Sequence, residues 1–223
     1  MDNAGTHKLR LAVFDLDGTL IELNHEHFAQ QIELTMGKLG IFCPPRARIL
    51  DLIHRQRISS LFSGESEQEA FWSRYDDGEC PPPRLFERSL EAVEAVASRG
   101  LTVAIATARF NDTDEIRRNL ASTGLLRHVT CISTFHGTSW RSKETQLRLV
   151  CREHRLDPKA AMMVGDSEDD LRSALNVGFG LRLGKLGTLT PPERLLAHRP
   201  WRVLSCIGEV PGEVDRYHGD TAQ

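Results

Sequence analysis

The chain has 223 residues, which is enough for one large domain or for a core domain with a small insertion. Its 28 Lys and Arg residues face 31 Asp and Glu residues, and the net charge of −3 argues against nucleic acid as a partner. No apolar run approaches the roughly 18 residues of a membrane span, and the polar N-terminal residues do not resemble a signal peptide, so we expect no membrane association. Five scattered cysteines without a Cys-x-x-Cys pair indicate free thiols in a reducing cytoplasm.

The first predicted strand ends in an unusual pair of carboxylates. Apolar residues at 9–14 are followed by Asp15-Leu16-Asp17-Gly18-Thr19. Two neighbouring desolvated aspartates disfavour joint ionisation, and a buried strand has no structural use for them. The motif therefore indicates a bound cation or acid–base chemistry at the end of this strand.

The next section of the chain, roughly residues 23–83, shows no convincing strand. It contains amphipathic helical stretches separated by Pro and Gly breakers, and the stretches lie at residues 28–36, 49–53 and 70–72. About 60 residues are too many for an ordinary connection between strands. We therefore predict a small α-helical domain inserted into the rest of the fold.

Beyond residue 83, short apolar runs alternate with helical patterns, which is typical of βαβ units and a parallel sheet. We expect strands at residues 101–106, 129–133, 160–164 and 179–183, helices at 84–99, 144–153 and 169–177, and a polar loop at 111–114. The predicted fold is α/β, with a Rossmann-like parallel sheet. Its core comprises residues 1–22 and 84–210, the helical cap residues 23–83, and a polar, frayed tail residues 211–223.

Several predicted strands are followed by polar residues. Because ligands of open parallel sheets bind at the carboxyl ends of the strands, we expect these side chains to meet. Lys143 opens a predicted helix within Trp140-Arg141-Ser142-Lys143, and a further acid lies in the first turn of the helix after 168. The converging residues are Asp15, Asp17, Thr107, Lys143, Asp166 and Asp170.

The chemistry that fits these residues is Mg²⁺-dependent phosphoryl transfer through an aspartyl-phosphate. Mg²⁺ prefers oxygen ligands and is commonly held by one or two carboxylates with substrate phosphate and water. Asp15 is the expected nucleophile and Asp17 the general acid and base.

The remaining residues of this group have supporting roles in the hypothesis. Thr107 and Lys143 bind the phosphoryl oxygens while charge redistributes. Asp166 ligates Mg²⁺, and Asp170 either ligates it through water or orients Lys143. Of the two adjacent acids we favour Asp170 as the inner one, with Asp169 as a helix cap or second ligand.

With these motifs in place, the chain resembles the haloacid dehalogenase superfamily, in the small-helical-cap branch that includes phosphoglycolate phosphatase-like enzymes. The matching motifs stand in the family's order over roughly residues 9–183. They are Asp15 to Thr19, Ala104-Ile105-Ala106-Thr107, Lys143, and Gly165 to Asp170.

The resemblance implies a HAD-like core with a mobile cap coupled through residues 18–24. It implies Mg²⁺ held by Asp15, Asp166 and Asp170 and partly by the backbone carbonyl of Asp17. Dehalogenases lack the second aspartate of the first motif, so Asp17 favours phosphoryl chemistry.

The same resemblance gives a phosphate-binding set of Gly18, Thr19, Thr107, Ala108, Arg109 and Lys143. Ala108 stands where many of these phosphatases have Asn, and Arg109 could instead meet an anionic leaving group.

We therefore predict a cytoplasmic Mg²⁺-dependent phosphatase acting on a small phosphorylated metabolite. Three alternatives stay open: a phosphomutase, a phosphonate hydrolase, and a non-catalytic phosphate-binding or regulatory protein. The phosphonate hydrolase needs a lysine in the cap, where only Lys38 is available. His25 and His27 are interpreted as structural, and the basic residues of the cap as a solvated helix face.

Overall fold

A computed structural model describes residues 8–55, 57–138, 142–187 and 190–220. Within these ranges the chain forms one six-stranded parallel sheet of order β3-β2-β1-β4-β5-β6. The strands are β1 (Leu11–Phe14), β2 (Thr102–Ala106), β3 (Val129–Ser133), β4 (Ala161–Gly165), β5 (Leu181–Lys185) and β6 (Arg202–Leu204). This confirms the α/β class and the parallel sheet that the alternating pattern predicts.

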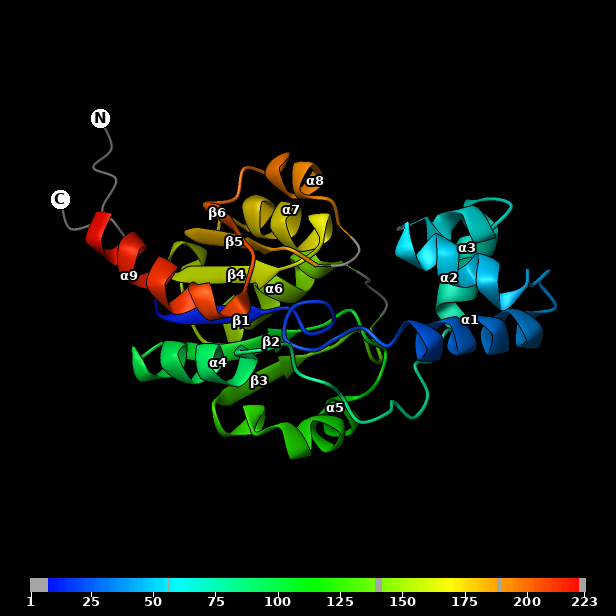
Figure 1. Ribbon diagram of the computed structural model, residues 1–223, viewed down its shortest axis with the longest axis horizontal. Coiled ribbons are helices and arrows are strands. Elements are labelled where there is room, and N and C mark those ends of the chain that lie inside the picture. The colour runs from blue at the N-terminus through cyan, green and yellow to red at the C-terminus, as the bar shows by residue number, and fades with distance from the viewer. Residues whose placement is uncertain (1–7, 56, 139–141, 188–189, 221–223) are drawn as a thin grey trace.

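Helices cover both faces of the sheet (Figure 1). One apolar cluster joins the sheet to α4, α5 and α9, and a second joins the opposite face to α6 and α7. Strand β1 is buried along its whole length, and successive residues belong to opposite clusters, as the two-residue period of a strand requires. The helices of this part are α4 (Ser89–Ser98), α5 (Thr113–Leu120), α6 (Lys143–Glu153), α7 (Glu168–Val177), α8 (Pro192–Leu196) and α9 (Val210–Asp220).

The part of the chain between β1 and α4 forms a separate group of helices to one side of the sheet (Figure 1). These are α1 (His25–Leu39), α2 (Arg46–His54) and α3 (Glu65–Arg74). They bury a small apolar cluster of their own around Ile32, Ile53 and Phe71. Helix α1 begins at Asn24, whose side chain accepts a hydrogen bond from the backbone of His27, and ends at Gly40 in the left-handed region.

The chain enters and leaves this helical group through two short passages that lie side by side. Ile21 and Leu85 form an antiparallel bridge, the backbone N–H of Glu22 donates to the carbonyl of Arg84 at 2.8 Å, and that of Phe86 donates to Leu20 at 3.1 Å. We call residues 20–22 and 84–86 the hinge pair. The division into core and cap at residues 23 and 83 remains our prediction.

Three local expectations are wrong. Residues 210–220 form α9, with Val214 fully buried against the core, rather than a frayed polar tail; residues 221–223 of that predicted tail lie outside the described residues. The predicted loop at 111–114 instead starts α5, because Asp112 and Glu115 form a capping box. The helix predicted from residue 84 begins only at Ser89, since residues 84–86 pair with the outgoing chain.

The described residues contain no helix long and apolar enough to cross a membrane.

Candidate active site

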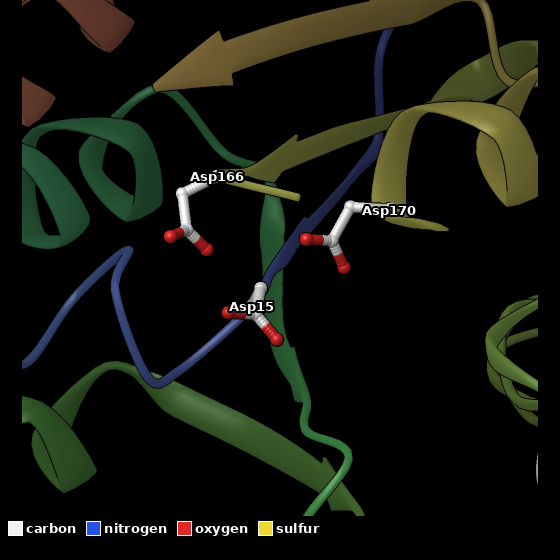
Figure 2. A group of neighbouring side chains, drawn as sticks. All are labelled: Asp15, Asp166 and Asp170. Atoms are coloured by element: carbon white, nitrogen blue, oxygen red, sulfur yellow. The ribbon is translucent and has the colours of Figure 1, made fainter. Parts of the chain in front are cut away.

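Three carboxylates meet where the strand order of the sheet reverses. Asp15 follows β1, Asp166 follows β4, and Asp170 lies in the first turn of α7. All three are buried, and one oxygen from each lies within 4.8 Å of the others; Figure 2 shows the carboxyl groups facing a common centre. The crevice at such a reversal point is the usual ligand site of open α/β sheets.

Lys143 neutralises part of this acidic cluster. Its Nζ lies 2.7 Å from an oxygen of Asp15 and 3.1 Å from one of Asp170, and it donates to the carbonyl of Ala106 at 2.5 Å. Burial lowers the pKa of this ammonium, but Asp15 and Asp170 together raise it above its ordinary value. Lys143 is therefore a permanent positive charge beside Asp15.

Burial dominates the titration of the carboxyl groups. It raises the pKa of Asp15 well above its ordinary value; Lys143 opposes this rise, and the like charges of Asp170 and Asp166 add to it. Burial, followed by the like charge of Asp170, also raises the pKa of Asp166 to about 7. Three ionised carboxylates this close together repel one another. A further bound cation would therefore stabilise the ionised form of the cluster.

The donor set fits a hard divalent cation. Carboxylate oxygens are the ligands that Mg²⁺ and Ca²⁺ prefer, and glycines allow them to pack closely. A Cβ atom on Gly18 would lie 2.2 Å from Asp166, and one on Gly165 would lie 2.4 Å from Asp170. Gly18 also has φ +85°, a conformation that residues with a side chain rarely adopt.

The cluster opens on a cavity of about 990 Å³. Thr107 and Ala108, directly after β2, line this cavity together with Asp15 and Lys143. Thr107 is buried, and its hydroxyl accepts a hydrogen bond from the backbone N–H of Arg109 at 3.2 Å. A phosphoryl group placed against Asp15 would thus contact the Lys143 ammonium and the segment of Thr107 and Ala108.

Asp17 lies apart from the carboxylate cluster and is paired with Arg109. Nε and Nη2 of Arg109 each donate to one oxygen of Asp17 at 2.7 Å, and Nη1 donates to Asn119 at 3.2 Å. The two paired side chains are 14% and 20% exposed, so the ion pair is partly shielded from water. A two-bonded pair of this kind fixes the orientation of both side chains.

The predicted residues fall into two groups in space. Eight of them line the cavity, whereas Gly18 and Thr19 do not, and Thr19 instead donates to Asp166 at 3.4 Å. The eight are Asp15, Asp17, Thr107, Ala108, Arg109, Lys143, Asp166 and Asp170. Trp140 and Arg141, quoted with Lys143, lie outside the described residues.

The two adjacent acids of α7 have different surroundings. Asp170 is buried, and its second oxygen accepts from the hydroxyl and backbone of Ser167, which caps the helix. Asp169 forms an exposed ion pair with Arg172 at 2.6 Å. The helix cap is therefore Ser167 and not Asp169, because the Ser167 hydroxyl accepts a hydrogen bond from the backbone N–H of Asp170, the third residue of α7.

Two buried polar residues near the site are not among the predicted ones. The amide of Gln146 donates to the carbonyls of Thr107 and Ser133, which ties the ends of β2 and β3 together. Lys185, at the end of β5, donates to the carbonyl of Gly18 at 2.8 Å. Its position two residues after the predicted strand at 179–183 was the available signal.

The helical group supplies the opposite wall of the cavity. Trp72 and Tyr75, from the end of α3 and just beyond it, contact the Phe110 ring of the core, with centroids 6.3 and 5.4 Å away. His25 pairs with His54 at 2.8 Å, and His27 bonds the backbone of Asp77. Lys38 is exposed in the last turn of α1 and does not line the cavity.

A family model described as haloacid dehalogenase-like hydrolase matches residues 9–178 of the chain. The match covers well over half of the sequence and spans every carboxylate described above. The protein belongs to the haloacid dehalogenase-like hydrolases. It is therefore an enzyme, and the family resemblance inferred from the motifs is confirmed.

Known relatives of this hydrolase share modest identity. A 5'-nucleotidase of Pseudomonas aeruginosa is 27% identical over 204 residues, covering 84% of this chain and 87% of the relative. A phosphoglycolate phosphatase of Mesorhizobium japonicum is 26% identical over 183 residues, covering 76% of this chain and 79% of the relative. The crystal structure of a predicted phosphatase from Clostridium acetobutylicum, 15% identical, superposes with a TM-score of 0.74 over 94% of this chain and 99% of that one, and supports the fold.

Proposed function

We propose that this hydrolase is a Mg²⁺-dependent phosphatase that cleaves small phosphomonoesters through an aspartyl-phosphate. The observation that carries the proposal is the 2.7 Å pair of Lys143 and Asp15 within a carboxylate cluster that opens on a cavity. The names of the two relatives, a 5'-nucleotidase and a phosphoglycolate phosphatase, support a phosphomonoester substrate. Five free cysteines fit the cytoplasmic location that we include in the proposal.

The reaction divides into two steps on the same carboxylate. In the first, an oxygen of Asp15 attacks phosphorus, the bond from phosphorus to the leaving oxygen breaks, and Asp17 gives that oxygen a proton. In the second, Asp17 removes a proton from water, the water oxygen attacks phosphorus, and the bond to Asp15 breaks. Phosphate leaves and both carboxyl groups return to their starting states.

The surrounding residues bind and orient the phosphoryl group. Lys143 and the Thr107–Ala108 segment would contact its oxygens as negative charge moves through them. Asp15, Asp166 and Asp170 would hold Mg²⁺, which supplies further positive charge at the phosphoryl oxygens. Our assignment of Gly18 and Thr19 to phosphate binding rests on the motif alone, since neither lines the cavity.

Arg109 is a partly buried cation that lines the same cavity. Lys143 is engaged with Asp15 and Asp170, whereas Arg109 contacts Asp17, the proposed acid and base. A guanidinium has five N–H donors, and Asp17 and Asn119 account for three of them. We assign Arg109 to holding Asp17 and to meeting an anionic group on the leaving alcohol.

The test is phosphate release from a panel of small phosphomonoesters, with and without Mg²⁺. Asp15→Asn should lower kcat by about 10⁴-fold or more, because it removes the nucleophile. Asp114→Asn, the same chemical change at an exposed position outside the cavity, is the matched control and should retain wild-type turnover. Turnover that survives in folded Asp15→Asn protein would rule out the covalent intermediate.

The same panel separates the alternative functions. A phosphomutase would return the phosphoryl group to the substrate and give an isomer without net phosphate. A non-catalytic phosphate-binding protein would bind Mg²⁺ or phosphate without turnover of any panel member. The exposed position of Lys38 disfavours the phosphonate hydrolase, which needs a lysine amine at the reacting carbon.

A further inference from the structure

Lys185 is a buried ammonium outside the carboxylate cluster. It is the last residue of β5, and only 4% of it is exposed. Burying an ammonium costs free energy unless polar or aromatic partners replace the lost water. The partners of Lys185 therefore indicate why a lysine occupies this position.

The charge of Lys185 interacts with Asp166, and its closest contacts belong to the two passages of chain between the sheet and the helical group. Lys185 Nζ donates to the carbonyl of Gly18 at 2.8 Å, on the outgoing chain directly after Asp17. The same atom lies 3.2 Å from the centroid of the Phe86 ring, on the returning chain. One side chain thus binds the outgoing turn through a hydrogen bond and the returning passage through a cation–π contact.

The contact with Phe86 reaches the hinge pair. The backbone N–H of Phe86 donates to Leu20, and that of Glu22 donates to Arg84. Because α1, α2 and α3 lie between these two passages in sequence, any movement of the helices relative to the sheet passes through the hinge pair. Lys185 fastens this pair to the edge of the sheet that carries the active site.

The contact with Gly18 reaches the carboxylate cluster. The turn containing Gly18 packs so closely on Asp166 that a Cβ atom there would lie 2.2 Å from the carboxylate. Thr19 of the same turn donates to Asp166 at 3.4 Å. A displacement of this turn would therefore move Asp17 and disturb the packing around Asp166.

We propose that Lys185 is a positioning residue that locks the Asp17–Thr19 turn and the hinge pair to the sheet. It keeps Asp17 at the site while the helical group moves. The structural part of the proposal stands on the contacts of Lys185 alone. Only its kinetic consequence rests on the proposed phosphatase function.

The first experiment is amide hydrogen exchange on metal-free protein, which requires no turnover. Lys185→Met keeps most of the side-chain volume and removes the charge and the donor. We expect about tenfold faster exchange at Gly18, Glu22 and Phe86, whose amide hydrogen bonds close the turn and the hinge pair. Amides of β2 and β3 should be unchanged, and the exposed Lys159→Met serves as the matched control.

The second experiment is steady-state kinetics on the same variants. Lys185→Met should lower kcat about tenfold with KM changed less than threefold, because the residue orients the reacting groups without touching substrate. Lys185→Arg should restore part of kcat, since a guanidinium also donates to a carbonyl and stacks on an aromatic ring.

A third variant protects the test against misfolding of Lys185→Met. Phe86→Leu leaves the bond from Lys185 to Gly18 in place and should speed exchange at Phe86 and Glu22 but not at Gly18. Unchanged exchange in both variants, or an equal rise throughout the protein, would overturn the proposal. Altered exchange in an enzyme without phosphatase activity would instead overturn the proposed function and leave the positioning role standing.

Discussion

Among individual side chains, Asp166 makes metal binding and stability depend on pH. Its pKa of about 7 in the folded protein, raised first by burial, lies above the ordinary 3.8 of an unfolded chain. The stability gained from its tightly held proton is therefore complete below pH 3.8 and is lost as the pH rises through about 7. A divalent cation needs ionised carboxylates, and burial raises the pKa of Asp15 as well as that of Asp166, so Mg²⁺ affinity should rise as the pH increases through about 7.

Calorimetric titration of metal-free protein with Mg²⁺ at a series of pH values measures this dependence. The Mg²⁺-induced rise in Tm should follow the same trend, with the larger rise above neutrality. Asp166→Asn removes the titrating group and should weaken binding at every pH. An affinity that stays constant across the series would contradict the role assigned to Asp166.

The pair of Arg109 and Asp17 should contribute measurably to stability. Its two 2.7 Å bonds are mostly shielded from solvent, unlike an exposed surface pair. Removing either partner leaves a partly buried charge, so Arg109→Met should lower the free energy of unfolding by about 1–3 kcal/mol. A double-mutant cycle with Asp17→Asn, measured by urea denaturation, should show coupling between the two. A coupling energy within about 0.3 kcal/mol of zero would mean that the two side chains act independently.

Among helices and strands, α9 is the clearest test of whether the last described residues belong to the core. Val214 lies on the face of α9 that packs against the core and is fully buried. Val214→Ala should therefore lower the free energy of unfolding by about 2 kcal/mol and Tm by about 4–8 °C. Gly212 on the same helix is exposed, and a Cβ atom there meets nothing within 4 Å. Gly212→Ala should therefore raise stability by up to about 1 kcal/mol. An unchanged Tm in Val214→Ala would show that residues 210–220 do not pack stably against the core.

The strands were predictable where apolar residues form continuous runs. Residues 129–133 match β3, and the runs at 101–106 and 160–164 match β2 and β4 within one residue at each end. Strand β6 has only three residues and a half-exposed pattern, so no continuous apolar run marks it. Helix α9 was missed because its burial depends on contacts with α4, which local sequence does not reveal.

The candidate site was predictable in part because its acids interrupt apolar strands. Asp15 and Asp166 follow β1 and β4 directly, and the sheet brings those two ends together. The pairing of Asp17 with Arg109 joins residues 92 positions apart, and the sequence around either residue does not indicate the other as its partner. Lys185 is not among the predicted residues because its hydrogen-bond and aromatic partners, Gly18 and Phe86, lie more than 90 residues away in sequence.

Across the two halves of the protein, the cavity is shared between the sheet and the helical group. The core contributes the carboxylates and Lys143, and α3 and the residue after it contribute Trp72 and Tyr75. The Trp72 and Phe110 rings are within 13° of parallel across this boundary, and Tyr75 contacts both. A substrate in this cavity would therefore lie between the carboxylate cluster and the aromatic wall.

This arrangement predicts that Trp72 reports closure of the helical group. A variant retaining Trp72 as its sole tryptophan, made by Trp140→Phe and Trp201→Phe, isolates its emission. Orthovanadate with Mg²⁺ imitates the phosphoryl group beside Asp15, and closure should exclude water from the Trp72 ring and shift its emission to shorter wavelength. Asp15→Asn in the same background should weaken vanadate binding and reduce the shift. Vanadate binding detected by calorimetry without any change in Trp72 emission would mean that the helical group does not move when the phosphoryl site fills.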